Sequence, residues 1–238
     1  MLLFYIRHGD PIYNPDMLTP LGKRQAEALG KRLAVYGLDK IFVSSSERAR
    51  QTAEPTAELL HIEPVVLDWL REGYAWQDLT DLNENGHRTW LESIPRYRAL
   101  FNSPAMRARG MAWTEDPVFE GTRVPAGIER IRGEAESLLA QFGYVHDREN
   151  CCFRVEKPSE ERIAVFGHEG CGKAFLSSIL DIPYPLFVLH CGLAHSGMSV
   201  IKFEDEGGVC YPKLLQLSGD GHLYREGLPT RYCNRTPI

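Results

Sequence analysis

Four short polar segments of this 238-residue chain carry the side chains best suited to catalysis. Each follows a brief apolar run of the kind that forms a buried strand. In chain order they are Arg7-His8-Gly9, Ser44-Ser45-Ser46-Glu47-Arg48, Leu70-Arg71-Glu72 and Gly167-His168-Glu169-Gly170. Because ligands bind beyond the carboxyl ends of the strands in open α/β sheets, we expect two histidines, at least two arginines and a glutamate to meet at one edge.

These residue types suit phosphoryl transfer. The phosphoryl group is a compact dianion, and its transfer needs positive charge and alignment more than covalent help. Arginine forks match phosphate oxygens in a bidentate way, and Arg48 would also lie in the first turn of a helix, where the dipole attracts anions. A neutral imidazole such as His8 can act as the nucleophile if its other nitrogen donates to a fixed acceptor, for example a backbone carbonyl. A carboxylic acid, for which Glu72 is the candidate, can protonate the leaving oxygen.

The motifs around these segments resemble a known family. Leu3–Gly9 is similar to the signature of the histidine phosphatase superfamily, which includes the phosphoglycerate mutases. The arginine-histidine-glycine tripeptide alone is a weak signal, whereas several motifs in the right order and spacing are specific. The similarity continues in register through Asn14, Leu18–Ala26, Ser44 with Arg48–Ala53, Leu70–Glu72 and Val165–His168, and so covers roughly residues 1–73 and 162–203.

The resemblance implies roles for six residues. His8, Glu72 and His168 would be catalytic, with His8 as the phosphorylated nucleophile and Glu72 as the proton donor. Arg7 and Arg48 would bind the phosphate together with His168, assisted by Asn14. The resemblance further implies a small phosphorylated substrate and no need for a metal or an organic cofactor.

The chain departs from the family pattern at three places. Asp10-Pro11 stands where many members have a glutamate and a hydroxyl residue, so a hydroxyl contact to the phosphate is missing there. Glu169 puts a carboxylate beside the second histidine, where it either repels substrate or orients a neighbouring group. After Glu72, Gly73–Trp76 matches neither the corresponding run of the cofactor-dependent mutases nor that of several small phosphatases. These departures bear on the substrate more than on the chemistry.

Some of these residues have alternative interpretations. Glu72 can be a surface carboxylate paired with Arg71, in which case Glu84 or Glu92 is the acid. His195 lies in a predicted loop and either faces the pocket or has a structural role. Large aromatic side chains usually anchor packing, which favours a place in the core of the lid, rather than stacking on the substrate, for Trp76, Trp90 and Trp113. The arginines of the middle segment are expected to be solvated. If one or two of them reached the site, they would bind a second anionic group of the substrate. These arginines are Arg88, Arg107, Arg109 and Arg123.

Strands and helices that would position these residues alternate along the chain. Apolar runs predict strands at Leu2–Ile6, Lys40–Val43, Pro64–Leu67, Ile163–Phe166, Met198–Phe203 and Lys213–Leu217. Helices are expected between Thr19 as N-cap and Gly37, from Ser44–Ser46 toward Leu60 with a kink or split at Pro55, and over Cys171–Leu180. This alternation predicts an α/β fold, namely a three-layer α/β/α sandwich around a mostly parallel sheet of about six strands.

The remaining segments lack a clear strand pattern. Residues 75–127 are expected to form an inserted, largely helical lid within a single histidine-phosphatase-like domain that spans residues 1–238. Residues 7–17 and 145–161 are polar, and we expect loops there.

The overall composition excludes several classes of protein. A net charge of −5 and a pI of about 5.9 give no sign of nucleic acid or an anionic membrane surface as partner. No stretch approaches the roughly 18 apolar residues that a transmembrane helix needs. Met1–Ile6 is apolar but runs straight into Arg7, unlike a signal peptide, so we expect the reducing cytoplasm. The six cysteines form no C-x-x-C pair, which disfavours a disulfide framework and a structural metal.

Together these observations predict a phosphomonoester hydrolase. It would be a metal-independent, histidine acid-type phosphatase that acts on a small phosphorylated metabolite through a phosphohistidine. A phosphoglycerate mutase-like phosphomutase is the alternative enzyme, because a long lid can keep water from the intermediate. Outside catalysis, the chain could be a phospholigand-binding protein, or a zinc-binding scaffold that uses Cys151, Cys152, His168 and Cys171. A homodimer is possible.

Overall fold

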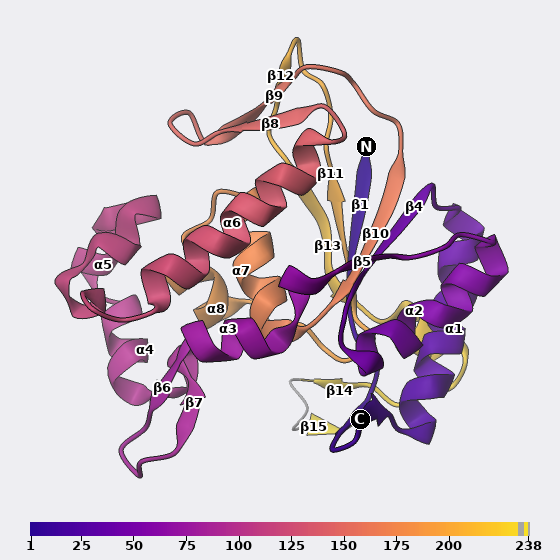
Figure 1. Ribbon diagram of the computed structural model, residues 1–238, viewed down its shortest axis with the longest axis horizontal. Helices are drawn as coiled ribbons and strands as arrows, with labels where there is room; N and C mark the ends of the chain where they lie inside the picture. Colours follow the sequence, from indigo (N-terminus) through magenta and orange to yellow (C-terminus); the bar gives the residue numbers. More distant parts are fainter. Residues whose placement is uncertain (233–235, 238) are drawn as a thin grey trace.

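A six-stranded sheet forms the centre of the computed structural model, which describes residues 1–232 and 236–237 and the side chains of residues 1–230 (Figure 1). Across the sheet the strands are β13 (Lys213–Gly219), β11 (Met198–Lys202), β1 (Leu2–Arg7), β10 (Arg162–Gly167), β4 (Lys40–Ser44) and β5 (Val65–Leu67). β1, β10, β4 and β5 run parallel, whereas β11 is antiparallel to both of its neighbours. The predicted fold class is confirmed, and each of the six strands lies within two residues of its expected bounds.

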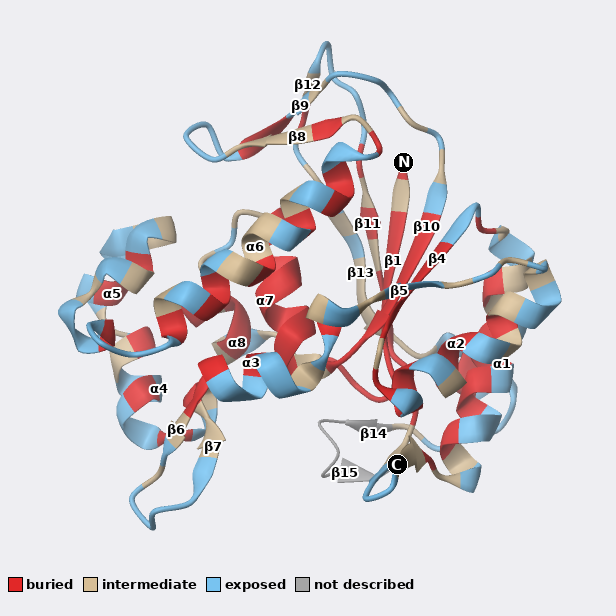
Figure 2. Cartoon of the chain, in the orientation of Figure 1, coloured by how far each residue is buried: buried red, intermediate tan, exposed pale blue. Residues whose placement is uncertain are grey.

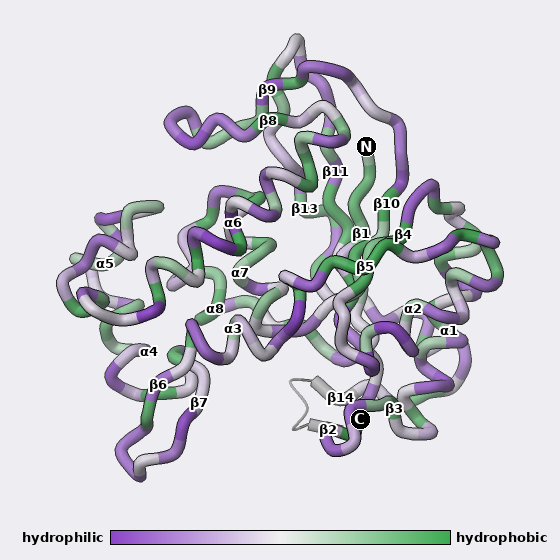
Figure 3. Tube along the Cα trace, viewed as in Figure 1, coloured by the Kyte–Doolittle hydropathy of each residue, from purple (hydrophilic) through white to green (hydrophobic). Residues whose placement is uncertain are grey.

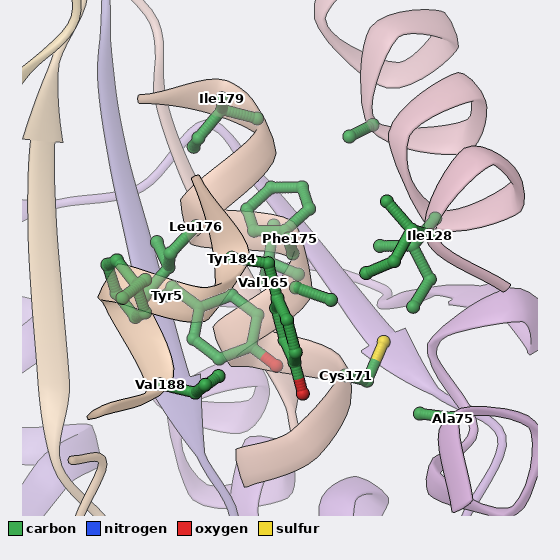
Figure 4. Close-up of a cluster of buried hydrophobic side chains, with 14 of the residues drawn as sticks. Tyr5, Ala75, Ile128, Val165, Cys171, Phe175, Leu176, Ile179, Tyr184 and Val188 are labelled. Carbon is green, nitrogen blue, oxygen red and sulfur yellow. The ribbon is translucent and has the colours of Figure 1, made fainter. Parts of the chain in front are cut away.

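Alternating side chains of the central strand β1 build two separate cores. Phe4 and Ile6 point into one apolar cluster, while Leu3 and Tyr5 point into the other. The first cluster is covered by α1 (Pro20–Tyr36) and α2 (Glu47–Leu60), and α9 (Gly221–Arg225) packs on α1. The second is covered by α6 (Val124–Ala140), α7 (Glu169–Ile179) and α8 (Tyr184–His190). In Figure 4, Tyr5 lies against Leu176 and Phe175 of α7. The strands at the centre are therefore hydrophobic and buried along most of their length (Figures 2 and 3).

The helix α1 begins and ends where the sequence predicts. The Thr19 hydroxyl accepts a hydrogen bond from the Gly22 N–H at 3.0 Å, and Gly37 ends the helix with a φ of 71°. The helix α2 runs unbroken through Pro55, so the split that we considered does not occur. Close packing on α1 supports this segment, because a Cβ at Gly30 would meet the backbone of Pro55 at 3.2 Å.

Residues 75–127 contain mostly short helices. The chain here passes through η1 (Asp68–Leu70), α3 (Glu72–Asp78), η2 (Leu91–Ser93), α4 (Pro95–Phe101), α5 (Pro104–Arg109), η3 (Gly110–Glu115) and η4 (Pro117–Phe119) before α6. It also forms a hairpin of β6 (Thr80–Leu82) and β7 (Arg88–Trp90), which the sequence did not predict. Trp113 is 1% exposed and packs its ring on Phe101, Phe119 and Tyr184, so the expected core position is confirmed for this tryptophan.

Two segments that we expected to be loops contain strands. Residues 145–161 include most of β8 (Tyr144–Asp147) and all of β9 (Cys152–Val155), which pair with each other. On its other side β9 pairs with β12 (Val209–Cys210). Phe153 is fully buried there between the rings of His146 and Phe203, so one aromatic anchor outweighs the polar composition. Residues 7–17 include β2 (Pro11–Tyr13), which pairs with β3 (Asp16–Leu18).

Near the end of the described chain, β14 (Arg231–Tyr232) pairs with β15 (Thr236–Pro237). Cys233 lies outside the described residues. No helix of the described part of the chain is long and apolar enough to cross a membrane.

Candidate active site

The predicted site residues meet at the carboxyl edge of β1, β10 and β4. Arg7 is paired with Gly167 in the sheet, so the residues that follow, His8 and His168, leave neighbouring strands side by side. Their ring centroids are 5.2 Å apart. His195 lies 5.2 Å from His8 on another side, because β11 begins opposite Ile6 and its preceding loop therefore reaches the same edge. All three imidazoles are buried.

The hydrogen bond of His8 fixes its tautomer. Nδ1 lies 2.8 Å from the carbonyl oxygen of Gly9, and a carbonyl can only accept, so Nδ1 carries the proton. The lone pair is then on Nε2. Burial and the neighbouring charges of Arg7 and Arg48 lower the pKa of His8 well below its ordinary value. His8 is therefore a neutral imidazole with an unprotonated Nε2, the form that a nucleophile requires.

Glycine at position 9 lets the backbone approach α1 closely. A Cβ there would lie 2.8 Å from the carbonyl oxygen of Gly22, and a Cβ on Gly22 would lie 2.2 Å from the carbonyl oxygen of Asp10. The N–H of Gly9 donates to the Thr52 hydroxyl, and that of Asp10 donates to the Gln25 side chain. The loop after β1 is thus held by two helices, which fixes the carbonyl that orients His8.

His168 has the opposite tautomer. Its Nδ1 lies 3.0 Å from Nη2 of Arg48, which can only donate, so the proton is on Nε2 and faces the Ser44 hydroxyl at 2.9 Å. Burial and the Arg48 charge lower the pKa of His168 well below its ordinary value. Arg48 lies in the first turn of α2, as predicted, and its Nη1 donates to Asp16 at 2.6 Å.

Arg7 is held by groups on three sides. Its guanidinium donates to the Leu193 carbonyl at 2.6 Å, contacts Nε2 of His195 at 2.9 Å and pairs with Glu169 at 2.8 Å. Glu169 therefore orients a neighbouring cation, one of the two roles that we considered. Burial opposes the charge of Glu169, but Arg7 and Lys173 together hold its pKa below the ordinary value.

Buried Lys173 extends this ionic network into the inserted segment. Its Nζ lies 2.9 Å from Glu169 and 3.2 Å from Glu92 of η2. Glu92, one of the alternative acids, is thus engaged in an ion pair. Glu84, the other, is exposed in the β6–β7 turn.

Glu72 lies at the amino end of α7, where its carboxylate accepts the N–H groups of Gly170 at 2.9 Å and Cys171 at 3.1 Å. Burial raises the pKa of Glu72, although these two N–H groups and the cations Arg7 and Arg48 act in the opposite direction. A carboxyl group with a raised pKa is suited to hold and deliver a proton.

Arg48 and Glu72 also line a pocket of about 560 Å³ that opens outward from the site. Its outer walls include Tyr13, Trp76 and Trp90. The structure therefore places two of the three tryptophans in the pocket, where we had expected all three in the core. Asn14 is exposed in the turn between β2 and β3, so its assisting role stays a prediction.

The lid arginines contact protein groups elsewhere. Arg123 pairs with Asp78, Arg109 pairs with Asp116, and Arg88 donates to Thr80. Arg71, which precedes the lid, does line the pocket. Among the described residues, no group of three or more His, Cys, Asp or Glu side chains is arranged to hold a metal ion. Cys151, a proposed zinc ligand, is exposed, whereas His168 is buried against Arg48.

The structure thus brings Arg7, His8, Arg48, Glu72 and His168 together, whereas Asn14 is exposed in a turn. Sequence reasoning missed Asp16 and Lys173, and it favoured the lid core over the pocket for Trp76 and Trp90. The position of Asp16 depends on the β2–β3 hairpin, and that of Trp90 depends on the β6–β7 hairpin in the lid. The sequence predicted neither hairpin. In the sequence, only the acidic residue directly after His168 indicated that Glu169 forms an ion pair near the site.

The chain is similar to known proteins over part of its sequence and over most of its fold. A family model described as the histidine phosphatase superfamily (branch 1) matches residues 3–137. PE_PGRS11, a PE-PGRS family protein of Mycobacterium tuberculosis, is 35% identical over 99 residues, which are 36% of this chain and 17% of that protein. A probable phosphatase of Schizosaccharomyces pombe is 34% identical over 92 residues, which are 35% of this chain and 44% of that protein. The chain therefore spans less than half the length of these curated relatives.

Among solved structures, a mycobacterial glucosyl-3-phosphoglycerate phosphatase superposes with a TM-score of 0.59 over 92% of this chain and 99% of that chain. The two sequences are 20% identical. This likeness extends the shared fold beyond residues 3–137 to nearly the whole chain.

Proposed function

The chain belongs to the histidine phosphatase superfamily, and on that premise we propose that it hydrolyses a small phosphomonoester through a phosphohistidine on His8. The observation that carries the proposal is the protonation state of His8. Its Nδ1 hydrogen is committed to the Gly9 carbonyl, and its lowered pKa keeps Nε2 unprotonated between two fixed arginines. The phosphatases among the similar proteins support the same reaction class.

In the first step, Nε2 of His8 attacks the phosphorus and the bond between phosphorus and the ester oxygen breaks. Arg7 and Arg48 stabilise the negative charge on the phosphoryl oxygens, with His168 completing the pocket. Protonated Glu72 gives its proton to the leaving oxygen, so the alcohol departs neutral. These side chains supply the positive charge, which favours a metal-independent reaction.

In the second step, water attacks the phosphohistidine. Ionised Glu72 takes a proton from the water as the phosphorus–nitrogen bond breaks, which regenerates both Glu72 and neutral His8. Inorganic phosphate leaves. In a phosphomutase, a second alcohol would replace this water, and in a phospholigand-binding protein neither step would occur.

The test uses a panel of phosphorylated metabolites in the presence of EDTA. Wild type should release inorganic phosphate from at least one compound, and His8→Ala should release none while keeping its circular dichroism spectrum and Tm. His87→Ala, which changes an exposed histidine in the β6–β7 turn, is the matched control and should keep full activity.

Acid-labile, alkali-stable ³²P bound to His8 should also be trapped by rapid quench. Activity retained in His8→Ala would disprove the nucleophile. Label that passes to an added alcohol without phosphate release would identify a mutase, and binding without label would identify a binding protein.

We also propose that the protein works in the reducing cytoplasm. The support is that Cys151, Cys152, Cys171, Cys191 and Cys210 are all free thiols. Cells lysed directly into denaturant and alkylating reagent without reductant should yield all of these cysteines alkylated, the buried ones included, as read by mass spectrometry. Finding them as disulfides would contradict this location.

A further inference from the structure

The pocket beside the proposed phosphate site is lined by both charged and aromatic side chains. Arg48 and Glu72 of the proposed site line it together with aromatic rings from three separate elements. These rings are Tyr13 of β2, Trp76 of α3 and Trp90 of β7, and α3 lies beside the amino end of α7 (Figure 1). Its volume of about 560 Å³ is in the ordinary range for a small-molecule site.

The Trp90 ring packs next to the residue that binds the proposed proton donor, Glu72. The ring lies so close to Gly170 that a Cβ there would be 2.2 Å from the indole carbon Cη2. The N–H of the same Gly170 donates to Glu72. The indole and the proposed proton donor therefore both lie against Gly170 and line the same pocket, so an alcohol bound in this pocket beside Glu72 can reach Trp90.

Trp76 is more exposed than packing alone would favour. It is 37% exposed and meets Trp90 edge-to-face, with ring centroids 5.2 Å apart. The aromatic core of the lid is centred on Trp113, and Trp90 is only partly buried where it packs against this core. On the opposite side, the Tyr13 ring is 64% exposed and lies 5.3 Å from the Arg48 guanidinium.

From this arrangement we infer that Trp76, Trp90 and Tyr13 form the leaving-group subsite, and that the preferred substrates are phosphomonoesters whose alcohol carries a flat apolar ring. This inference rests on the proposed phosphatase function. Aromatic faces bind planar rings through dispersion, edge-to-face contact and removal of apolar area from water. A leaving group without a ring would not cover these indoles, so it would gain no binding free energy from contact with them.

The experiment compares 2-phenylethyl phosphate with ethyl phosphate. Both are primary alkyl esters that need the same help from Glu72, so their ratio of kcat/KM isolates the ring. Wild type should prefer the phenyl compound by at least about tenfold, the order of one stacking contact. Trp76→Ala should reduce this preference to near unity with little change for ethyl phosphate, and Trp90→Phe should reduce it in part.

Tyr74→Ala is the matched control. Tyr74 lies on the same helix, is also 37% exposed and does not line the pocket, so its replacement should keep the wild-type ratio. Partial unfolding of a variant would lower kcat/KM for both esters by the same factor. The ratio of the two values therefore reports on the folded protein alone. An equal ratio in wild type and Trp76→Ala would overturn the subsite.

A binding measurement separates this inference from the proposed function. If wild type hydrolyses neither ester, calorimetry with 2-phenylethylphosphonate and ethylphosphonate still tests the subsite. A tenfold tighter Kd for the phenyl compound, lost in Trp76→Ala, would support the subsite while the phosphatase proposal fails. Equal Kd values would overturn the subsite.

Discussion

At the scale of single residues, the site depends on two histidines that are kept neutral in opposite tautomers. The Gly9 carbonyl can only accept, and Arg48 can only donate, so the proton is on Nδ1 of His8 and on Nε2 of His168. The sequence predicted the backbone carbonyl acceptor of His8, because a nucleophilic nitrogen requires one. It could not predict the tautomer of His168, which depends on the position of an arginine 120 residues away.

Glu72→Gln tests the proton donor. This variant should lower kcat/KM for alkyl phosphates by about 10²–10⁴-fold, because a poor leaving group needs the proton. The value for 4-nitrophenyl phosphate should fall far less, since its leaving group departs without one. For both substrates, kcat/KM reports only the steps up to formation of the phosphohistidine. The measurement is therefore not affected by the later role of Glu72 as a base.

Glu84→Gln, which changes an exposed carboxylate in the lid hairpin, should leave both substrates unaffected. Equal losses for the two substrates in Glu72→Gln would assign the acid role to another group.

At the scale of elements, the loop after β1 is fixed by close contact with α1. The sequence predicted α1, its caps and the strands well, because each has a local signal in its apolar spacing or its capping residues. It did not predict the β2–β3, β6–β7 and β8–β9 pairs. Those strands are short and polar, and they are stabilised by partners such as Arg48 for Asp16 and Phe203 for Phe153.

Gly22→Ala should be destabilising although it replaces a helical glycine. The new Cβ would lie 2.2 Å from the Asp10 carbonyl oxygen, so the loop that carries His8 must move. We expect a loss of about 1–3 kcal/mol in the free energy of unfolding, measured with urea, together with reduced turnover. Gly133→Ala on α6 is the control, because nothing lies within 4 Å of its Cβ. It should gain about 0.5–1 kcal/mol from helix propensity, and a similar gain in Gly22→Ala would contradict the tight contact.

His146 ties β8 to two other elements. Its Nδ1 lies 2.7 Å from Glu136 of α6, which also pairs with Arg148, and its Nε2 lies 3.1 Å from Asp181. Both ring nitrogens face carboxylates, so the ring carries both protons. Burial opposes this charge, but the bonds to Asp181 and Glu136 outweigh it and raise the pKa of His146.

His146→Gln should therefore destabilise the protein in a pH-dependent way. The folded pKa is above the unfolded value, so the contribution of the ion pairs is complete below about pH 6.5 and is lost as pH rises through the folded pKa. Urea titrations from pH 5.5 to 9 should show a deficit of about 1.5–3 kcal/mol at low pH that shrinks toward high pH. His87→Gln should show no such trend, and a deficit independent of pH would mean that only packing is lost.

At the scale of the whole molecule, buried neutral histidines make the fold sensitive to acid. Burial is the largest cause that lowers the pKa values of His8, His168 and His222, and that of His222 falls to about 4. The unfolded chain takes up protons that the native state excludes. Stability should therefore decline as pH falls from about 6.5 toward 4.

His222→Gln isolates one of these protons outside the proposed active site. His222 is buried between α1 and α9, with Nε2 2.9 Å from the Ser196 hydroxyl, which a glutamine amide can also contact. The slope of unfolding free energy against pH between about 4.5 and 6 should become shallower by up to about 1.4 kcal/mol per pH unit. An unchanged slope would show that His222 is protonated in the folded protein.

The order of strands in the sheet is the part of the fold that the sequence could not supply. Six strands and their lengths follow from local apolar runs, but the placement of β11 between β1 and β13, antiparallel to both, depends on contacts distant in the chain. That placement brings His195 to His8. The sequence pattern identifies the strands but not which strands are neighbours. It therefore could not decide whether His195 faces the pocket or has a structural role.

The central position of β1 also affects synthesis of the protein. Of the six strands in the central sheet β1 is translated first, yet its two neighbours, β10 and β11, end only at Gly167 and Lys202. At about 5–20 residues per second, the apolar run Leu2–Ile6 waits roughly 10–30 seconds for its first partner strand. During that time α1, α2 and β4 can be made but have no complete sheet to cover. An apolar strand from the centre of the sheet therefore stays unpaired until late in elongation, and transiently unpaired apolar strands favour aggregation.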